Sequence, residues 1–514
     1  MKKLLLYVIL ALICASSNTI YSQSPTDFQL PEPVMVELNR LGEAYQILDQ
    51  FADDVWEGWD DYMSYPFLMT FQNGLRILIG HPAPPPEFVP FPDVKVRGLA
   101  LHIDTTRLNN FPVKLPLRAG GGPIPLGMFN NKMVTVVDIR FTAPVSVQEE
   151  STGILKGEND ILIFIHELMH CYQPKILRNQ YGNLRINPDL NIALFSDIEG
   201  TALLKAYEQG TLNGSLPYLK DFCIARSYKI RDLSRSERNS YSCDEFREGE
   251  ATYSEVVVLQ SVREGFKSSL AASVDNGYTH FADPGEFLSR YSRNLKSSAI
   301  NTLDIYDKNY WFGCFEALLL QRYYPGWQQE LRNEVWLDQI IRKRVNITPE
   351  DSLNALERFR EVYNIDSLRA KHGTVISERD DTYRMFQELE GRTYIINMKP
   401  ISQYLSSLVD KTVKNYRLGL IYMYPDGIGD IKFDDVSVSF KPVPTEINQL
   451  YYVKVIDTES GKNKKAYKME YESEDDDGYF YNATITTPLF TLKAPKISIR
   501  ESSNRVKFIV HSRV

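Results

Sequence analysis

Cysteine is scarce in this chain of 514 residues, which has five cysteines and no Cys-x-x-Cys pair. A scaffold built on disulfides needs a much higher cysteine density, so we expect a hydrophobic core to hold the fold together. The same scarcity argues against a structural zinc site made of thiolates. Cys223 and Cys243 are one candidate disulfide pair, whose geometry the sequence leaves open.

Long apolar runs are also missing beyond the N-terminus, so no transmembrane segment is expected, since spanning a bilayer takes ~20 apolar residues. The first residues, MKKLLLYVILALICASSNTIYSQS, place two lysines before a short apolar run and then small polar residues. This layout is typical of a secretory signal peptide, here residues 1–22, and predicts an exported protein, periplasmic or extracellular. Ile13 before Cys14 is bulkier than the small residue that a lipoprotein signal requires, which disfavours lipid anchoring.

A positive charge excess is absent as well. The chain has 58 Lys and Arg against 66 Asp and Glu, a net charge of −8. No basic stripe with interleaved aromatic residues stands out in the sequence, so we expect no nucleic acid partner. The 43% hydrophobic content is that of an ordinary soluble protein, and the length allows two or three domains.

Three regions of different pattern predict an α+β fold. Residues 23–145 combine a helical pattern over 33–62 with alternating runs that predict a small antiparallel or mixed sheet. Residues 146–375 are mostly helical in pattern, and Thr348 followed by proline predicts a helix start. Residues 390–514 contain short strands separated by turn signals, which predict a β-rich, sandwich-like domain.

Histidine is rare too, with seven in the chain, yet two of them lie close together in ILIFIHELMHCYQPK. Capping residues at the start and a proline near the end predict a helix from Asn159 to Pro174. His166 and His170 lie four residues apart, so they project from one helix face and can bind one metal ion. Glu167 is placed to act as a general base toward water. The pattern predicts a Zn²⁺ site.

The third ligand has to come from another segment, because the residues after His170 lack the Gly-x-x-His continuation of metzincins. Two segments are candidates: SDIEGTALLKAY with Glu199, 29 residues after His170, and REGEATYSEV with Glu248, 78 residues after it. Glu-Gly-x-Ala-x-Tyr at 248–253 resembles the ligand helix of the gluzincin-clan, peptidase MA-like metallopeptidases. We therefore favour Glu248 and keep Glu199 as the alternative. Gly249 is expected to let this helix approach the histidine helix closely.

A further segment, NYWFGCFEALLLQRYYPGW, resembles the Tyr-x-x-Gly helix start that carries an oxyanion-stabilising tyrosine in aminopeptidase families of the same clan. On this resemblance Tyr310 is the candidate donor, with Gly313 as its glycine, while Tyr253 and His280 are weaker alternatives. The resemblance spans about residues 130–335. It implies a gluzincin-like catalytic unit, made of the small N-terminal sheet and a mainly helical zinc lobe, that hydrolyses peptide bonds in peptide or protein substrates.

One departure from the resemblance bears on activity. The exopeptidases of the clan have a Gly-x-Met-Glu-Asn stretch whose glutamate holds the substrate amino group, but this chain has Gly-Met-Phe-Asn at 127–130. Endopeptidase or oligopeptidase action is therefore favoured over aminopeptidase action. Two other interpretations stay open: an exported binding or adhesion protein with a vestigial zinc site, and zinc-dependent hydrolysis of a bond other than a peptide. The oligomeric state is not predicted.

Overall fold

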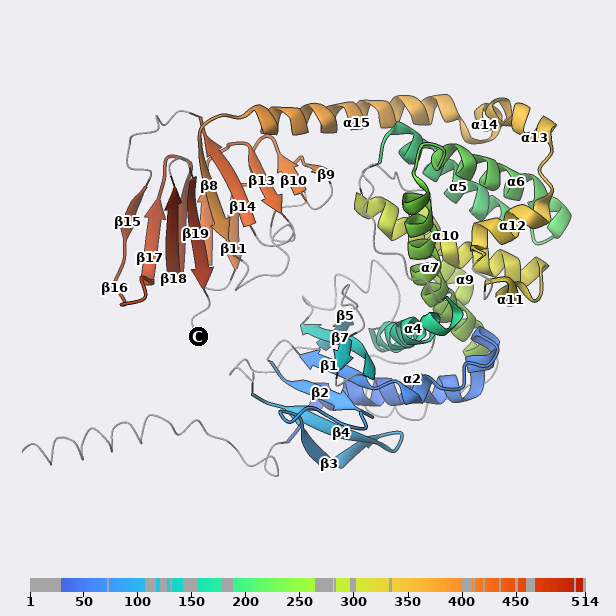
Figure 1. Cartoon of the computed structure of the whole chain (residues 1–514), viewed down its shortest axis with the longest axis horizontal. Helices are drawn as coiled ribbons and strands as arrows, with labels where there is room; N and C mark the ends of the chain where they lie inside the picture. The colour runs from blue at the N-terminus through green and yellow to red at the C-terminus, as the bar shows by residue number, and fades with distance from the viewer. Residues whose placement is uncertain are drawn as a thin grey trace, which may run out of the picture.

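The structure is a computed structural model of the whole chain (Figure 1). It describes residues 29–511, apart from 72–73, 107–116, 121–126, 130–131, 142–155, 178–187, 264–280, 282, 296–301, 332–334, 399–408, 410–411, 419–420, 434–435, 449–451, 459–466 and 503–504. The expected signal peptide and His280 therefore lie outside the described residues. Within the described part, no helix combines the length and the apolar character needed to cross a membrane.

The first described element is the long helix α2, Glu32–Val55, which begins after Pro31. It is shorter than the helical pattern expected over 33–62, because Trp56 adopts an extended backbone with φ −150° and ψ 119°. Trp56 and Trp59 are fully buried, and both belong to the main hydrophobic core. The chain leaves the helix where these two large side chains enter the core.

The N-terminal sheet is mixed, which is one of the two arrangements that the sequence predicts. β1 pairs in parallel with β7, while the other described strand pairs in this sheet are antiparallel. The strand order is β3-β4-β2-β1-β7-β5, with β6 beside β7. Helix α4 packs under this sheet, where Phe67 of β1 meets Phe164 edge to face at 5.4 Å. The strands are β1 Phe67–Phe71, β2 Arg76–Ile79, β3 Val89–Val96, β4 Leu99–Asp104, β5 Leu117–Gly120, β6 Gly127–Phe129 and β7 Lys132–Phe141.

Helix α4, Lys156–Ile176, contains both predicted histidines, but its bounds differ from the expected ones. It begins three residues before Asn159, so that residue is not a cap. Asp160 instead forms a buried ion pair with Arg40 of α2 at 2.5 Å. Pro174 lies in the last turn of the helix, which ends two residues later. The helix is therefore fixed to α2 through a buried ion pair as well as through apolar contacts.

The region after α4 is helical, and it shares one continuous hydrophobic core with the N-terminal helix and sheet. Thr348 accepts a hydrogen bond from the backbone N–H of Asp351 and precedes Pro349 at the start of α13, which confirms the predicted helix start. Cys223 and Cys243 are separate buried thiols in this core, so the candidate disulfide is not formed. The helices are α5 Leu190–Glu208, α6 Leu212–Lys229, α7 Arg235–Arg263, α9 Pro284–Leu295, α10 Thr302–Tyr323, α11 Trp327–Leu331, α12 Leu337–Val345, α13 Pro349–Leu353 and α14 Ala355–Tyr363.

Helix α15, Ile365–Glu388, runs from the helical region to the C-terminal strands (Figure 1). Near its start, buried His372 bonds to Asp197 of α5 at 2.9 Å. Just past its midpoint, Glu378 accepts a hydrogen bond from the Tyr416 hydroxyl of β9 at 2.5 Å. The helix is therefore attached both to the helical region and to the C-terminal sheet.

The C-terminal region is rich in β-strands, as predicted, and its described strands form one hydrogen-bonded network of 12. The sheet curls around a core of its own, because Tyr394 of β8 meets Phe490 of β18 at 5.7 Å although these two strands are not paired at that point. The strands are β8 Arg392–Asn397, β9 Tyr416–Leu418, β10 Ile421–Tyr424, β11 Asp430–Phe433, β12 Val436–Phe440, β13 Thr445–Asn448, β14 Tyr452–Asp457, β15 Lys468–Glu470, β16 Ser473–Glu474, β17 Phe480–Thr486, β18 Phe490–Ser502 and β19 Arg505–His511.

Candidate metal centre

The two histidines of α4 lie on one face of the helix, where their rings meet at 4.8 Å with an angle of 87° between the planes. This is the arrangement that a four-residue spacing produces on a helix. The flanking residues Ile165 and Met169 are fully buried in the core. The helix is therefore held rigidly, and both imidazoles project toward α7.

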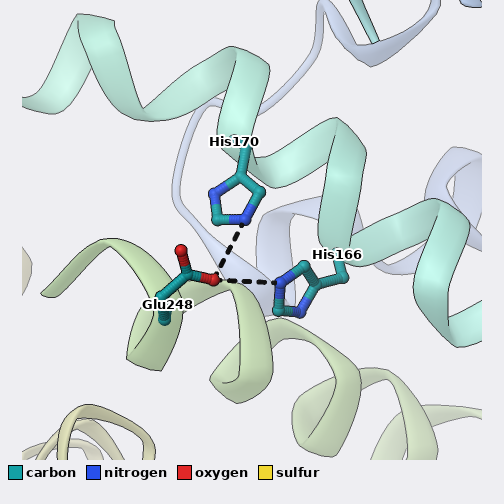
Figure 2. A group of neighbouring side chains, drawn as sticks. All are labelled: His166, His170 and Glu248. Carbon is teal, nitrogen blue, oxygen red and sulfur yellow. Dashed lines mark ion pairs between the residues drawn. The ribbon is translucent and has the colours of Figure 1, made fainter. Parts of the chain in front are cut away.

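Glu248 of α7 completes a group of three metal-type donors. Its Oε2 atom lies 3.5 Å from Nε2 of His170 and 3.7 Å from Nε2 of His166. Figure 2 shows the carboxylate and both imidazoles pointing toward one another, and the three donor atoms lie within 4.8 Å of one another. A tetrahedral zinc site with bonds of about 2.0–2.1 Å separates its donors by about 3.3 Å. The donor types and their separations fit a divalent metal ion.

The outer nitrogen of each histidine has a partner of its own. Nδ1 of His166 lies 2.6 Å from Oε1 of Glu255, and Nδ1 of His170 lies 2.9 Å from Oε1 of Gln173. Gln173 in turn donates to the backbone carbonyl of Arg247 at 2.6 Å. Such partners fix the tautomer of an imidazole, so that Nε2 is the nitrogen left for a metal. The ring orientations are therefore set before any ion is bound.

Sequence reasoning missed Glu255 and Gln173, although a signal for each exists. Glu255 is seven residues after Glu248, a spacing of two helical turns that places both on one face of α7. Gln173 is three residues after His170 on α4, which makes it a neighbour on the helix surface. Both relationships are visible only once the ligand helices have been identified.

The three donors and their neighbours shift one another's pKa values strongly. Burial lowers the pKa of His166, but the hydrogen bonds of Glu248 and Glu255 outweigh it and raise the pKa to about 10. Burial raises the pKa of Glu248, but the two histidines outweigh it and hold that pKa well below its usual range. The centre is thus a desolvated carboxylate beside imidazoles, which favours a bound cation.

Glu167 lies between the two histidines in the sequence and is partly exposed. Burial raises the pKa of its carboxyl group, and the charges of the two histidines oppose that shift. The carboxyl group therefore lies near both imidazole rings. Glu248 and Glu255 raise the same pKa further. The carboxyl group therefore sits beside the three donors without being one of them.

Tyr310 of α10 reaches the same centre. Its ring stacks on the ring of His166 at 5.9 Å with 17° between the planes. Helix α10 lies close against α7, where a Cβ atom on Gly249 would come within 2.3 Å of the Cα atom of Gly313. Gly249 was expected to allow close approach to the histidine helix, but it faces α10 instead. The two glycines bring the helix of Tyr310 against the helix of Glu248.

Glu199, the alternative third ligand, is fully buried in a separate cluster of charges. Its carboxylate accepts hydrogen bonds from Arg226, at 2.7 Å, and from Lys229. Arg226 also donates to the Glu245 carboxylate through its two terminal nitrogens, Nη1 and Nη2, and to Glu316 at 3.3 Å. Because its two oxygens are engaged by these cations, Glu199 is held on the helix pair α5–α6, away from the three donors.

The weaker tyrosine alternative lies on another face of α7. The hydroxyl of Tyr253 is buried, and its ring meets Trp327 edge to face at 5.9 Å. Glu250, two residues after Glu248, is also fully buried, and among the described residues its carboxyl oxygens have no hydrogen-bond partner. Burial raises the pKa of Glu250 well above its usual range. Neither residue is part of the donor group.

Comparison with known proteins identifies no match for this chain. No protein-family model, no curated protein and no solved structure matches the chain. The chemistry of the site has to be inferred from its own geometry.

Proposed function

We propose that this protein is a zinc-dependent peptidase of the gluzincin type. The observation that carries the proposal is the convergence of Nε2 of His166, Nε2 of His170 and Oε2 of Glu248. Glu167 follows the first histidine directly in the sequence. Two imidazoles and one carboxylate form a typical ligand set of catalytic zinc, which leaves a coordination position open. Zinc is favoured over magnesium or calcium because those ions prefer oxygen ligands alone.

In this proposal each residue of the site has a separate task. His166, His170 and Glu248 would hold the zinc ion, which when bound would polarise a carbonyl oxygen as a Lewis acid and lower the pKa of water. The carboxylate of Glu167 accepts the proton of the attacking water and delivers it to the leaving amine. The hydroxyl of Tyr310 donates a hydrogen bond to the substrate oxyanion.

The proposed substrate is an internal peptide bond of a peptide or protein. In the aminopeptidases that the chain resembles, a glutamate holds the substrate amino group. The stretch that begins in β6, at Gly127–Phe129, has no glutamate. A peptide with a blocked N-terminus is therefore expected to be cleaved as well as its unblocked counterpart.

The test compares the wild type with Glu167→Gln on a mixed peptide library that contains free and N-acetylated members. Cleavage is followed by mass spectrometry, and bound zinc is measured on the same samples. We expect Glu167→Gln to keep its zinc and to cleave peptides about 10²–10⁴-fold more slowly than the wild type. Glu250→Gln serves as the matched control, because that buried carboxyl lies outside the donor group. Full activity in Glu167→Gln would overturn the mechanism, and cleavage of other ester or amide bonds without peptide cleavage would overturn the substrate class.

We also propose that the protein acts outside the cytoplasm. The support is the sequence of residues 1–22, where two lysines precede a short apolar run. N-terminal sequencing of the protein recovered from the medium or the periplasm checks this. A mature chain that begins near Gln23 is the expected result, and an intact N-terminus in the cytoplasmic fraction would contradict it.

A further inference from the structure

Strands β18 and β19, side by side in the C-terminal sheet (Figure 1), present one face to the outside. On the inner face, Ile497 of β18 pairs with Val510 of β19, and both are fully buried. Successive residues of a strand point to opposite faces. The residues directly before and after Ile497 and Val510 along each strand therefore project outward. The outer face therefore carries four cations, which we call the basic face: Lys496, Arg500, Arg505 and Lys507.

Two of these cations lie directly opposite each other, because the register pairs Arg500 with Lys507. Like charges placed opposite each other destabilise a sheet. Among the described residues, no carboxylate forms an ion pair with Arg500, Arg505 or Lys507. The adjacent carboxylate of Glu501 accepts a hydrogen bond from the Tyr467 hydroxyl, and the Tyr467 ring lies against Phe508 of the core.

Two other strands of the same sheet show the usual arrangement, in which a cation lies opposite an acid. On β13 and β14, Lys454 lies opposite Glu446, and the two form an ion pair at 2.9 Å. The sheet thus pairs a cation with an acid at one cross-strand position and places two cations together at another. Arg500, Arg505 and Lys507 therefore form a local excess of positive charge in a chain whose net charge is −8.

Neutral hydrogen-bonding side chains lie among the cations. Ser498 lies two residues before Arg500, and Ser502 lies opposite Arg505 in the register. At one end of the face, the ammonium of Lys496 is held over the rings of Tyr479, at 4.3 Å, and Tyr481, at 5.3 Å. The lysine therefore occupies one face of each ring, which leaves less open ring surface for the base stacking that single-stranded nucleic acid uses.

We propose that the basic face binds a linear acidic polysaccharide. Such a polymer carries carboxylates, which neutralise Arg500, Arg505 and Lys507, together with hydroxyl groups, which bond to the serines beside them. The outer surface of two extended strands fits an extended chain, whereas a folded acidic protein would need an apolar core to its interface. This binding does not depend on the zinc chemistry proposed above.

The test measures binding of the full chain to polygalacturonate by isothermal titration calorimetry at two salt concentrations. The test variant is Arg500→Ser/Lys507→Ser. The control is Lys441→Ser/Lys493→Ser, which removes the same charge from two exposed positions outside the basic face. We expect the test variant to bind about tenfold more weakly or worse, with higher salt weakening the wild type, and the control to bind as the wild type does.

Three binding results would overturn the proposal: no binding by the wild type, equal losses in both double variants, or binding of single-stranded DNA or anionic vesicles as tight as that of polygalacturonate. Thermal unfolding of the test variant separates a binding defect from misfolding. Removal of the opposed pair is expected to leave the melting temperature unchanged or higher, since the two charges repel each other. A lower melting temperature would show that Arg500 and Lys507 stabilise the sheet, and would also count against the proposal.

Discussion

Gly249 and Gly313 touch through their backbones at the crossing of α7 and α10. A Cβ atom on Gly313 would lie 2.2 Å from the carbonyl oxygen of Glu245 and 2.8 Å from the Cα atom of Gly249. Glu248 is the neighbour of one glycine, and Tyr310 is one helical turn before the other. The crossing therefore links the third metal donor to the tyrosine that stacks on His166.

Gly313→Ala is expected to lower the free energy of unfolding by about 1–3 kcal/mol, because backbone atoms have to move apart to admit the methyl group. The matched control is Gly373→Ala in α15, where an added Cβ atom meets nothing within 4 Å. That change is expected to raise stability by about 0.5–1 kcal/mol, since glycine is unfavourable inside a helix. Urea unfolding measures both, and equal effects of the two substitutions would show that the crossing is not close.

Glu255→Gln is expected to weaken zinc binding about tenfold, because the carboxylate that orients His166 and adds to its basicity is replaced by a neutral amide. Competition with a chromogenic chelator gives the zinc affinity directly. Glu250→Gln is the control, since it changes another buried glutamate of α7 that lies outside the donor group. Unchanged affinity in Glu255→Gln would remove this residue from the centre.

Tyr310→Phe tests the proposed donor to the oxyanion. Loss of one such hydrogen bond typically lowers kcat by about 10²–10³-fold, and neither KM nor bound zinc should change. Tyr253→Phe, which removes a buried hydroxyl on another face of α7, should leave kcat as it is. A normal kcat for Tyr310→Phe, or equal losses in both variants, would mean that the ring of Tyr310 serves only to pack against His166.

Glu316→Gln should show a pH-dependent gain in stability. Burial, with Glu245, raises the pKa of Glu316 well above its usual 4.5 and outweighs Arg226. The folded protein therefore holds a proton that the unfolded chain releases above about pH 4.5, so the wild type loses stability as pH rises through this window. Urea unfolding should show little difference at pH 5 and a more stable variant at pH 8. A variant less stable than the wild type at pH 8 would show that Glu316 is an ionised partner of Arg226.

The helix of His166 and His170 could be predicted from the sequence because local pattern determines it. An apolar face, a four-residue histidine spacing and a nearby proline are all contained in about five helical turns. Its first residue was misplaced because Asp160, a good capping residue, is used in a buried ion pair with Arg40, more than 100 positions away. The cap at Thr348 has no such competitor and was predicted correctly.

The third donor was harder to predict because both candidate segments use the same local pattern for different contacts. Gly200, after Glu199, lets the end of α9 approach, since its Cβ atom would lie 2.1 Å from the carbonyl oxygen of Leu295. Gly249, after Glu248, does the same for α10. A Glu-Gly pair therefore marks a close helix crossing in either segment. Which glutamate faces the histidines depends on tertiary packing and on Arg226 and Lys229, which engage Glu199.

The basic face escaped sequence analysis for a related reason. Its four cations alternate with apolar residues along two strands, so no run of positive charge is visible in the sequence. Only the register of β18 with β19 brings Arg500 and Lys507 together.

Zinc content after dialysis tests the metal centre most directly, in the wild type and in the matched variants Glu248→Gln and Glu199→Gln. Elemental analysis should find about one zinc per chain in the wild type and in Glu199→Gln, and little in Glu248→Gln, because Glu248 rather than Glu199 faces both histidines. No zinc in the wild type, or loss of zinc in Glu199→Gln with retention in Glu248→Gln, would contradict the assignment of this centre.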